Sequence, residues 1–467
     1  MIKNDNSALA STSSFNSLNL SEAQLANLQQ LGYEQMTAIQ ALALPLALSA
    51  QDLIVQAHTG SGKTLVFALA ILQTLDLSRI EAQALVLCPT RELATQVAEV
   101  IRKVGRSHPS LKVSLICGGA SISRQQASLA QGTHIIVGTP GRIEDLINRG
   151  ALPLGSVKTL VFDEADKMMD MGFYESLSTI SNACPLKRQT LMFSATYSPA
   201  LLERTEGFLI NPHMIQAIDE PKPEIQQEFY LVNANERGQA LISLLNHHLP
   251  LATLAFCNTR DECELLQRQL QRAGIISHVL HGQMEQRERE DVLIQFANHS
   301  CSVLVATDVA ARGLDIHALD LVVNAHISPN ADTHLHRIGR TGRQGATGHA
   351  ITFVTEDELF RKKRIEEVSA QRFDLLAAPP AWQGRQHLKA PMQTITIRGG
   401  KKDKLRAGDI LGSLTKTLGV AAEQVGKITI HDFVSFVAIA RDIAPQVAQR
   451  WQQTTIKGKR RKISLLP

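Results

Sequence analysis

Short apolar runs alternate with amphipathic stretches along most of this chain. The first series has five runs, each followed by a turn and a stretch of helical periodicity: 53–56, 84–88, 134–137, 159–162 and 191–193. This alternation is typical of a parallel sheet whose strands are joined by helices. The segment 219–224, Asp-Glu-Pro-Lys-Pro-Glu, then interrupts the pattern with charge and proline, and predicts a linker.

A second series of apolar runs follows the linker, at 253–257, 278–280, 303–306, 321–324 and 350–354. It predicts a second α/β domain of similar size. A proline-containing segment at 377–384 predicts another linker. Beyond it the patterns predict strand, helix, two strands, helix and strand, at 394–397, 408–418, 427–431, 434–438, 444–451 and 462–465. That order is the split βαβ motif.

The chain of 467 residues is too long for one ordinary core, so several domains are expected. The predicted fold class is α/β, with two parallel-sheet domains followed by a small C-terminal α+β domain. The predicted boundaries are a disordered N-terminus (1–14), a first domain (15–215), a linker (216–228), a second domain (229–375), a linker (376–391) and the small domain (392–467).

Composition changes this picture mainly through charge. A hydrophobic fraction of 44% and a charged fraction of 20% are normal for a globular protein and exclude a mainly disordered or fibrous chain. The formal charge of +4 is unevenly distributed, because residues 389–467 carry 15 Lys+Arg and only 5 Asp+Glu. Such a basic tail indicates nucleic acid or another anionic surface as a partner, the alternative being a tail that serves solubility only.

Cysteine spacing and hydropathy indicate a reduced, cytoplasmic protein without a membrane partner. No two of the six cysteines form a Cys-x-x-Cys pair, so neither a zinc site nor a redox motif is indicated, and buried free thiols are expected. The sequence has no run of 18 apolar residues, and its start lacks the apolar core of a signal peptide.

A glycine-rich turn between a predicted strand and helix has the parts of a phosphate-binding loop. Gly60 and Gly62 let backbone N–H groups face a phosphate, Lys63 can reach the β and γ phosphates, and the Thr64 hydroxyl can bind Mg²⁺. ATP and Mg²⁺ are therefore the expected ligands, although Ala57 stands where the strict pattern has glycine. The candidate residues are Ala57, His58, Thr59, Gly60, Ser61, Gly62, Lys63 and Thr64.

Two charged segments complete a nucleotide site. Asp163 follows the apolar run 159–162 and is suited to hold Mg²⁺ through water, while Glu164 can act as general base for the attacking water. Arg340 and Arg343, in the second domain, can supply positive charge to the γ phosphate when the domains close. Taken alone, the acids fit a solvated helix start and the arginines a basic surface loop.

The sequence Asp163-Glu164-Ala165-Asp166 belongs to an ordered set of motifs that resembles the DEAD-box RNA helicases over about residues 15–370. The other matching segments, in order, are 89–93, 118–119, 139–142, Ser194-Ala195-Thr196, 256–259, Gln286 with Arg289, 306–315 and 336–343.

The resemblance implies two RecA-like domains and a set of residue roles. Phe15 would stack on the adenine and Gln40 would read its edge, with Asp315 also at the nucleotide and Arg340 and Arg343 at the γ phosphate. Residues implied to couple ATP to RNA are Asp166, Ser194, Thr196 and His336. Residues implied to hold the RNA backbone are Thr90, Arg91, Gly119, Thr139, Arg142, Arg260 and Thr307. Together they imply ATP-driven local unwinding of short RNA duplexes.

The tail resembles an RNA recognition motif (RRM), but only Phe436 stands where two or three base-stacking aromatics are usual. Its basic residues form two clusters suited to phosphate contacts: Lys401, Lys402, Lys404 and Arg406, and Lys457, Lys459, Arg460 and Arg461. The segments 399–412, 425–428 and 456–459 resemble the tail of bacterial DEAD-box helicases that act in assembly of the large ribosomal subunit. That implies tethering to 23S rRNA, and no stable protein partner is implied. A general RNA chaperone or degradosome helicase and an ATP-gated RNA clamp are the alternatives, and a DNA helicase is the least favoured.

Overall fold

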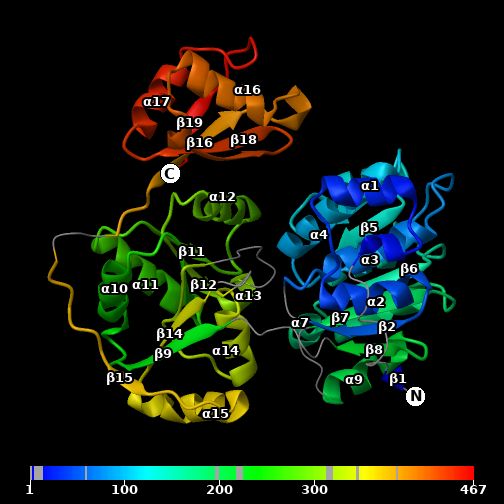
Figure 1. Cartoon of the computed structure of the whole chain (residues 1–467), viewed down its shortest axis with the longest axis horizontal. Coiled ribbons are helices and arrows are strands. Elements are labelled where there is room, and N and C mark those ends of the chain that lie inside the picture. The colour runs from blue at the N-terminus through cyan, green and yellow to red at the C-terminus, as the bar shows by residue number, and fades with distance from the viewer. Residues whose placement is uncertain are drawn as a thin grey trace. The chain divides into compact units, whose positions relative to one another are not determined.

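The structure is a computed structural model that describes residues 3–4, 14–57, 60–194, 199–216, 224–311, 319–342, 347–384 and 388–466. The described residues form two compact units, one up to residue 216 and the other from residue 224 onward (Figure 1). Five predicted site residues lie outside the described ranges: His58, Thr59, Thr196, Asp315 and Arg343. Most of the linker segment 219–224 also lies outside them.

The first unit is built on a sheet in which every pairing is parallel, in the order β1-β8-β2-β7-β6-β3-β5-β4. The strands are β1 (Lys3–Asn4), β2 (Leu53–Gln56), β3 (Ala84–Leu87), β4 (Val113–Ile116), β5 (Ile135–Gly138), β6 (Thr159–Asp163), β7 (Gln189–Ser194) and β8 (His213–Gln216). Because the strands are parallel, their C-terminal ends share one edge of the sheet, where ligands bind in such folds.

Helices cover both faces of this sheet (Figure 1). Alternate residues of one strand enter different cores, since Val86 packs in one hydrophobic cluster and Leu85 and Leu87 in the other. The helices are η1 (Phe15–Ser17), α1 (Glu22–Gln30), α2 (Ala38–Leu48), α3 (Lys63–Thr74), α4 (Arg91–Val104), η2 (Gly105–Ser107), α5 (Ile122–Ala130), α6 (Pro140–Asn148), α7 (Ala165–Asp170), α8 (Tyr174–Ala183), α9 (Pro199–Thr205) and η3 (Glu206–Phe208).

The second unit contains another parallel sheet, in the order β11-β12-β10-β13-β14-β9-β15. The strands are β9 (Ile225–Leu231), β10 (Thr253–Cys257), β11 (Ser277–Leu280), β12 (Val303–Thr307), β13 (Leu321–Asn324), β14 (Gly348–Val354) and β15 (Leu375–Ala377). The helices are α10 (Arg237–His248), α11 (Arg260–Arg272), α12 (Gln286–Ala297), α13 (Asp308–Ala311), α14 (Ala331–Ile338), η4 (Glu356–Glu358) and α15 (Leu359–Ser369).

The C-terminal domain, within the second unit, has an antiparallel sheet in the order β17-β18-β16-β19. Two helices pack on one face, where Ile395, Val437 and Trp451 share the core. Its elements are β16 (Met392–Arg398), η5 (Lys401–Asp403), α16 (Ala407–Gly412), the π-helix η6 (Ser413–Thr417), η7 (Ala422–Gln424), β17 (Val425–Ile430), β18 (Val434–Ala440), α17 (Ala444–Trp451) and β19 (Ile463–Leu465).

The predicted fold class is confirmed, with two parallel-sheet domains and a small α+β domain. The sequence pattern did not predict strands β4, β8 and β9, which are only partly buried and carry polar residues, nor β15, which has three exposed residues. Lys3 and Asn4, in the segment expected to be disordered, form β1 beside β8. All six cysteines are free and buried, as expected. Within the described ranges, no helix has the length and apolar character needed to span a membrane.

Candidate nucleotide and nucleic-acid sites

The phosphate loop joins β2 to α3 at the C-terminal edge of the first sheet. Gly60 and Gly62 have φ values of 93° and 87°, in the left-handed region that residues other than glycine rarely adopt. Gly62 is the N-cap of α3, so the first free N–H groups of the helix point toward the loop. Lys63 is buried, and its ammonium donates to the Ala57 carbonyl. The loop therefore has the backbone shape and the cation of an anion site.

Gln40 connects the start of α2 to this loop. Its Oε1 accepts from the Thr37 backbone N–H at 2.9 Å, and its Nε2 donates to the Gly62 carbonyl at 3.1 Å. The Thr37 hydroxyl donates to the Ser61 carbonyl at 2.8 Å. Phe15, in η1, is buried in the same core as α2 and α3. The segment predicted to read adenine is therefore bonded to the segment predicted to hold phosphate.

The acidic segment follows β6 at the same sheet edge. Asp163 is the last residue of β6, and Glu164 has φ 56°, a strained conformation for a residue with a side chain. Glu164 Oε1 lies 2.7 Å from the Lys167 ammonium, and both side chains are buried. Asp166 Oδ1 accepts from the backbone N–H of Lys167 at 2.9 Å. The predicted general base is thus held by a buried ion pair.

Burial dominates the electrostatics of these charges. It raises the pKa of Asp163 to about 7, with a further contribution from Glu164, while Lys63 and Lys167 oppose the shift. Burial also lowers the pKa of Lys63, against the attraction of Asp163 and Glu164. The loop and the acidic segment lie at one edge of the sheet, and Lys63 and Asp163 accordingly influence each other's pKa. Perturbed ionisable groups of this kind gather at active sites.

The side chains present fit Mg²⁺. Thr64, the second residue of α3, is partly exposed, and Asp163 is the last residue of β6. Magnesium prefers oxygen ligands and is usually held by one or two protein groups together with phosphates and water. A cation beside Asp163 would favour its carboxylate form over the protonated form.

Strand β7 links the acids to the phosphate loop. Asp163 is paired in register with Phe193, and the next residue, Ser194, ends the strand. The Ser194 carbonyl accepts from the Ala57 N–H at 2.9 Å. Ser194 is therefore in direct contact with the loop that it is predicted to couple to RNA.

The predicted RNA-binding residues of the first domain gather at the ends of β3, β5 and β4, beside the nucleotide site on the same sheet edge. Thr90 is the N-cap of α4, and Thr139 is the N-cap of α6. A side chain at Gly119, where φ is 77°, would lie 1.7 Å from the Arg91 guanidinium. Arg142 donates to Gln125 Oε1 at 2.8 Å and to the Ala120 carbonyl at 3.0 Å. Three motifs distant in sequence thus form one surface.

In the second domain, Arg337 connects three of the predicted motifs. It is buried and donates to both oxygens of Asp308, at 2.6 and 2.8 Å, and to Asn258 Oδ1 at 2.8 Å. Its guanidinium lies 5.1 Å from the Phe256 ring centroid. His336 directly precedes Arg337, and Arg340, which is also buried, follows it three positions later. Arg260 starts α11 after β10, and Thr307 ends the neighbouring β12, so both lie at one sheet edge.

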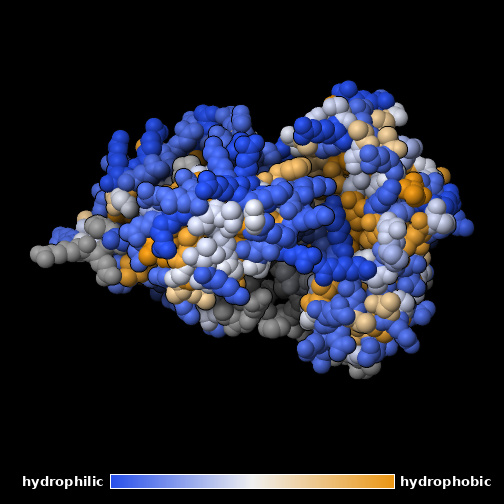
Figure 2. Space-filling view, turned by 90° about the horizontal axis from the view of Figure 1, so that it is seen from above, coloured by the Kyte–Doolittle hydropathy of each residue, from blue (hydrophilic) through white to orange (hydrophobic). Residues whose placement is uncertain are grey.

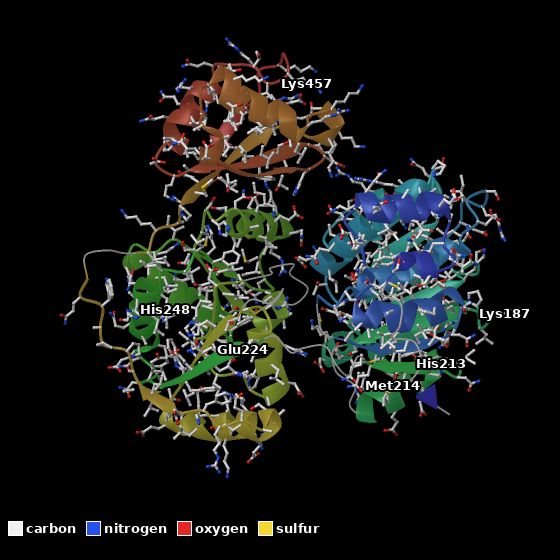
Figure 3. The ribbon with its side chains drawn as sticks, in the orientation of Figure 1. Lys187, His213, Met214, Glu224, His248 and Lys457 are labelled. Carbon is white, nitrogen blue, oxygen red and sulfur yellow. The ribbon has the colours of Figure 1, made fainter. Side chains whose placement is uncertain are left out.

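In the C-terminal domain, the two basic clusters meet at one end of the sheet. Arg398 is paired with Val434 and Ile397 with Ile463, so the end of β16 and the starts of β18 and β19 coincide. Lys457 (Figure 3) donates to the Lys404 carbonyl at 2.7 Å. We call this end of the sheet the basic rim, formed by the loops 399–406 and 452–462 and the turn 431–433. Its exposed basic residues are Lys401, Lys402, Lys404, Arg406, Lys457, Lys459, Arg460 and Lys462.

The face of this sheet that is free of helices contacts the second α/β domain. Thr394 is fully buried, and its hydroxyl bonds to Asn298 Nδ2 at 3.0 Å and to the Ser300 hydroxyl at 2.8 Å. Arg441 donates to the Ser300 carbonyl at 2.7 Å. Phe436, on the same face, is only 4% exposed. Thr394 and Phe436, on the face where an RRM normally stacks bases, are therefore not exposed for such stacking.

The sequence matches three protein families in order. These are the DEAD/DEAH box helicase over residues 37–204, the helicase conserved C-terminal domain over 236–345 and the DbpA RNA binding domain over 394–465. The ATP-dependent RNA helicase DbpA of Escherichia coli (strain K12) is 43% identical over 97% of this chain and 99% of its own length. DbpA of Bacillus subtilis (strain 168) is 36% identical over the same shares.

The chain belongs to the DbpA-type DEAD-box ATP-dependent RNA helicases. A similar solved structure is Saccharomyces cerevisiae Dbp5 bound to RNA and ADP BeF3, with a TM-score of 0.72 and 28% identity over 79% of this chain and 96% of that one. This DEAD-box chain is thus an ATP-hydrolysing enzyme that binds RNA.

Three features of this helicase were not predicted from its sequence. Lys167 had no role, although a lysine three residues after a glutamate at a helix start is a signal for an ion pair. Arg337 was part of a recognised motif, but its burial was not expected. Phe433, in the basic rim, is 70% exposed, and no sequence pattern predicted a role for it.

Proposed function

We propose that this helicase locally unwinds short duplexes of 23S rRNA during assembly of the large ribosomal subunit, to which its C-terminal domain tethers it. The observation that carries the proposal is the basic rim, in a domain that matches the DbpA RNA binding domain. Exposed lysines and arginines on adjoining loops suit the phosphates of a folded RNA. Such a substrate places the enzyme in the cytoplasm.

In the proposed reaction, the residues of the first domain bind and orient ATP. Gln40 and Phe15 hold the adenine, and Lys63 with the loop N–H groups holds the phosphates. Thr64 and Asp163 would hold Mg²⁺, which neutralises phosphate charge. Glu164 accepts the proton of the attacking water. These roles agree with the shared sheet edge and with the contact between Gln40 and Gly62.

The second domain makes ATP hydrolysis depend on domain closure. Arg340 and Arg343, with Asp315, act on the nucleotide only when the two domains close, so that ATP and RNA stabilise one closed state. RNA held along Thr90, Arg91 and their neighbours in both domains is bent in that state, and a bent strand leaves its duplex. Asp166, Ser194, Thr196 and His336 couple the two ligands. Hydrolysis and phosphate release reopen the enzyme.

The basic rim is tested by substituting four exposed residues, Lys401, Lys402, Lys459 and Arg460, together with alanine in the full chain. ATPase activity is measured with 23S rRNA and with 16S rRNA as stimulating RNAs. We expect the parent protein to prefer 23S rRNA, and the variant to lose that preference while keeping its basal activity. Equal stimulation of the parent protein by both RNAs would contradict the proposed substrate.

A further inference from the structure

We infer that Phe433 is a nucleobase-stacking contact of the basic rim, so that the tail holds an unpaired base of its RNA as well as phosphates. This inference rests on the proposed role of the rim in RNA binding. It adds a binding residue of a different chemical kind, because a phenyl ring recognises the face of a base and not a charge.

Phe433 is exposed although its surroundings are well ordered by hydrogen bonds. It is 70% exposed, more than any other aromatic side chain in the described ranges. The hairpin turn that carries it is closed by a bond from the His431 N–H to the Val434 carbonyl at 2.8 Å. Single exposed apolar residues are common, and the face in Figure 2 shows them among hydrophilic ones. The exposure of Phe433 therefore does not indicate a binding site by itself, and the residues around it have to be considered as well.

The neighbours are lysines whose backbone is bonded to the same turn. The Lys401 N–H donates to the His431 carbonyl at 2.8 Å, and the Lys402 N–H donates to the Asp432 carbonyl at 2.9 Å. A side chain at Gly400 would lie 2.1 Å from the His431 carbonyl, so this close approach requires glycine. The turn that carries Phe433 is thus joined by backbone hydrogen bonds to the loop that carries Lys401 and Lys402, so an exposed ring and two exposed lysines belong to the same rim.

Two residues on the helix-free face of the sheet are buried, which bears on the role of the exposed ring at its end. Thr394 and Phe436, which lie on the face that stacks bases in other RRMs, are buried. Base stacking in this domain would therefore need an aromatic side chain other than Phe436. Among the described residues 388–466, Phe433 is the one exposed aromatic side chain. A protein partner would also cover an exposed phenyl ring, but the adjoining lysines favour a polyanion.

The test compares Phe433→Ala, Phe433→Leu and Phe433→Trp in the full chain, with binding to 23S rRNA measured over a range of salt concentrations. We expect about 10-fold weaker binding for Phe433→Ala, a similar loss for Phe433→Leu and near-parent binding for Phe433→Trp, because only an aromatic face stacks. The salt dependence of binding should stay unchanged in all three, since no phosphate contact is removed. Phe360→Ala, at a phenyl ring 56% exposed in α15, is the matched control and should bind as the parent does.

Three results would overturn the inference. The first is parent-like RNA binding by Phe433→Ala, which would leave the ring to a protein partner or to no partner. The second is full binding by Phe433→Leu, which would indicate an apolar contact without stacking. The third is a weaker salt dependence or a lower Tm in Phe433→Ala, which would indicate a disturbed rim. If the fourfold basic variant also binds 23S rRNA normally, the proposed function itself fails, and the two failures are distinguishable.

Discussion

The nucleotide edge of the first sheet and the basic rim of the C-terminal domain both lie at strand ends, but they hold their charges in opposite ways. At the nucleotide edge, Lys63, Asp163, Glu164 and Lys167 are all buried, Lys63 is bonded to the Ala57 carbonyl, and Glu164 is paired with Lys167. At the rim, most of the lysines and arginines are exposed to solvent. Buried charges interact strongly and depend on precise partners, whereas exposed charges are screened and nearly interchangeable.

The difference indicates what each region can do. A preorganised buried set stabilises charge that develops at one point, as hydrolysis of a phosphate bond requires. An exposed set gains affinity from the number of its phosphate contacts and tolerates variation in their positions. Substitutions should therefore have large and specific effects at the first region, and small and cumulative effects at the second.

The largest expected effect is that of Glu164→Gln at the nucleotide edge. Loss of a general base should lower RNA-stimulated kcat by about 10²–10⁴-fold, while ATP binding stays near normal because Lys63 and the loop remain. Single-turnover hydrolysis and nucleotide titration measure the two quantities separately. Substantial remaining turnover would remove Glu164 from the role proposed for it.

A smaller but still specific effect is expected for Lys167→Met. We expect kcat to fall about tenfold, equivalent to about 1.4 kcal/mol of transition-state stabilisation, because the Glu164 carboxylate loses the ammonium that orients it at 2.7 Å. Steady-state ATPase assays should show little change in KM for ATP. Lys167→Arg should restore part of the activity, since it keeps the charge.

The control for Lys167→Met is Lys187→Met, which removes an exposed lysine of the same domain (Figure 3). It should leave kcat and KM unchanged. If both methionine variants had the same kcat as the parent, the ion pair would be structural only, and burial would not distinguish the two regions as argued above.

The same contrast explains what the sequence could predict. Lys63, Asp163 and Gln40 were predictable because their chemistry requires particular residue types beside a strand end. The pairing of Lys167 with Glu164 depends on side-chain conformations within α7, which the pattern does not contain. The contact of Thr394 with Asn298 joins residues 96 positions apart, so the burial of Thr394 on the sheet face could not be predicted from the local sequence pattern. The basic residues of the rim were predicted from the sequence, but the exposure of Phe433 among them was not.

The smallest effects are expected within the rim, for Lys459→Ala and Lys457→Ala. Each should weaken binding of 23S rRNA only a few-fold and reduce the slope of log affinity against log salt by about one. The two variants should differ in stability, because Lys457 bonds to the Lys404 carbonyl at 2.7 Å and lies 3.3 Å from Asp409, whereas Lys459 is an exposed side chain. Lys457→Ala should therefore lower Tm slightly, and Lys459→Ala should not. A loss of binding by Lys459→Ala as severe as the loss of turnover in Glu164→Gln would show that the rim is also a precise site, and that exposure does not make its charges interchangeable.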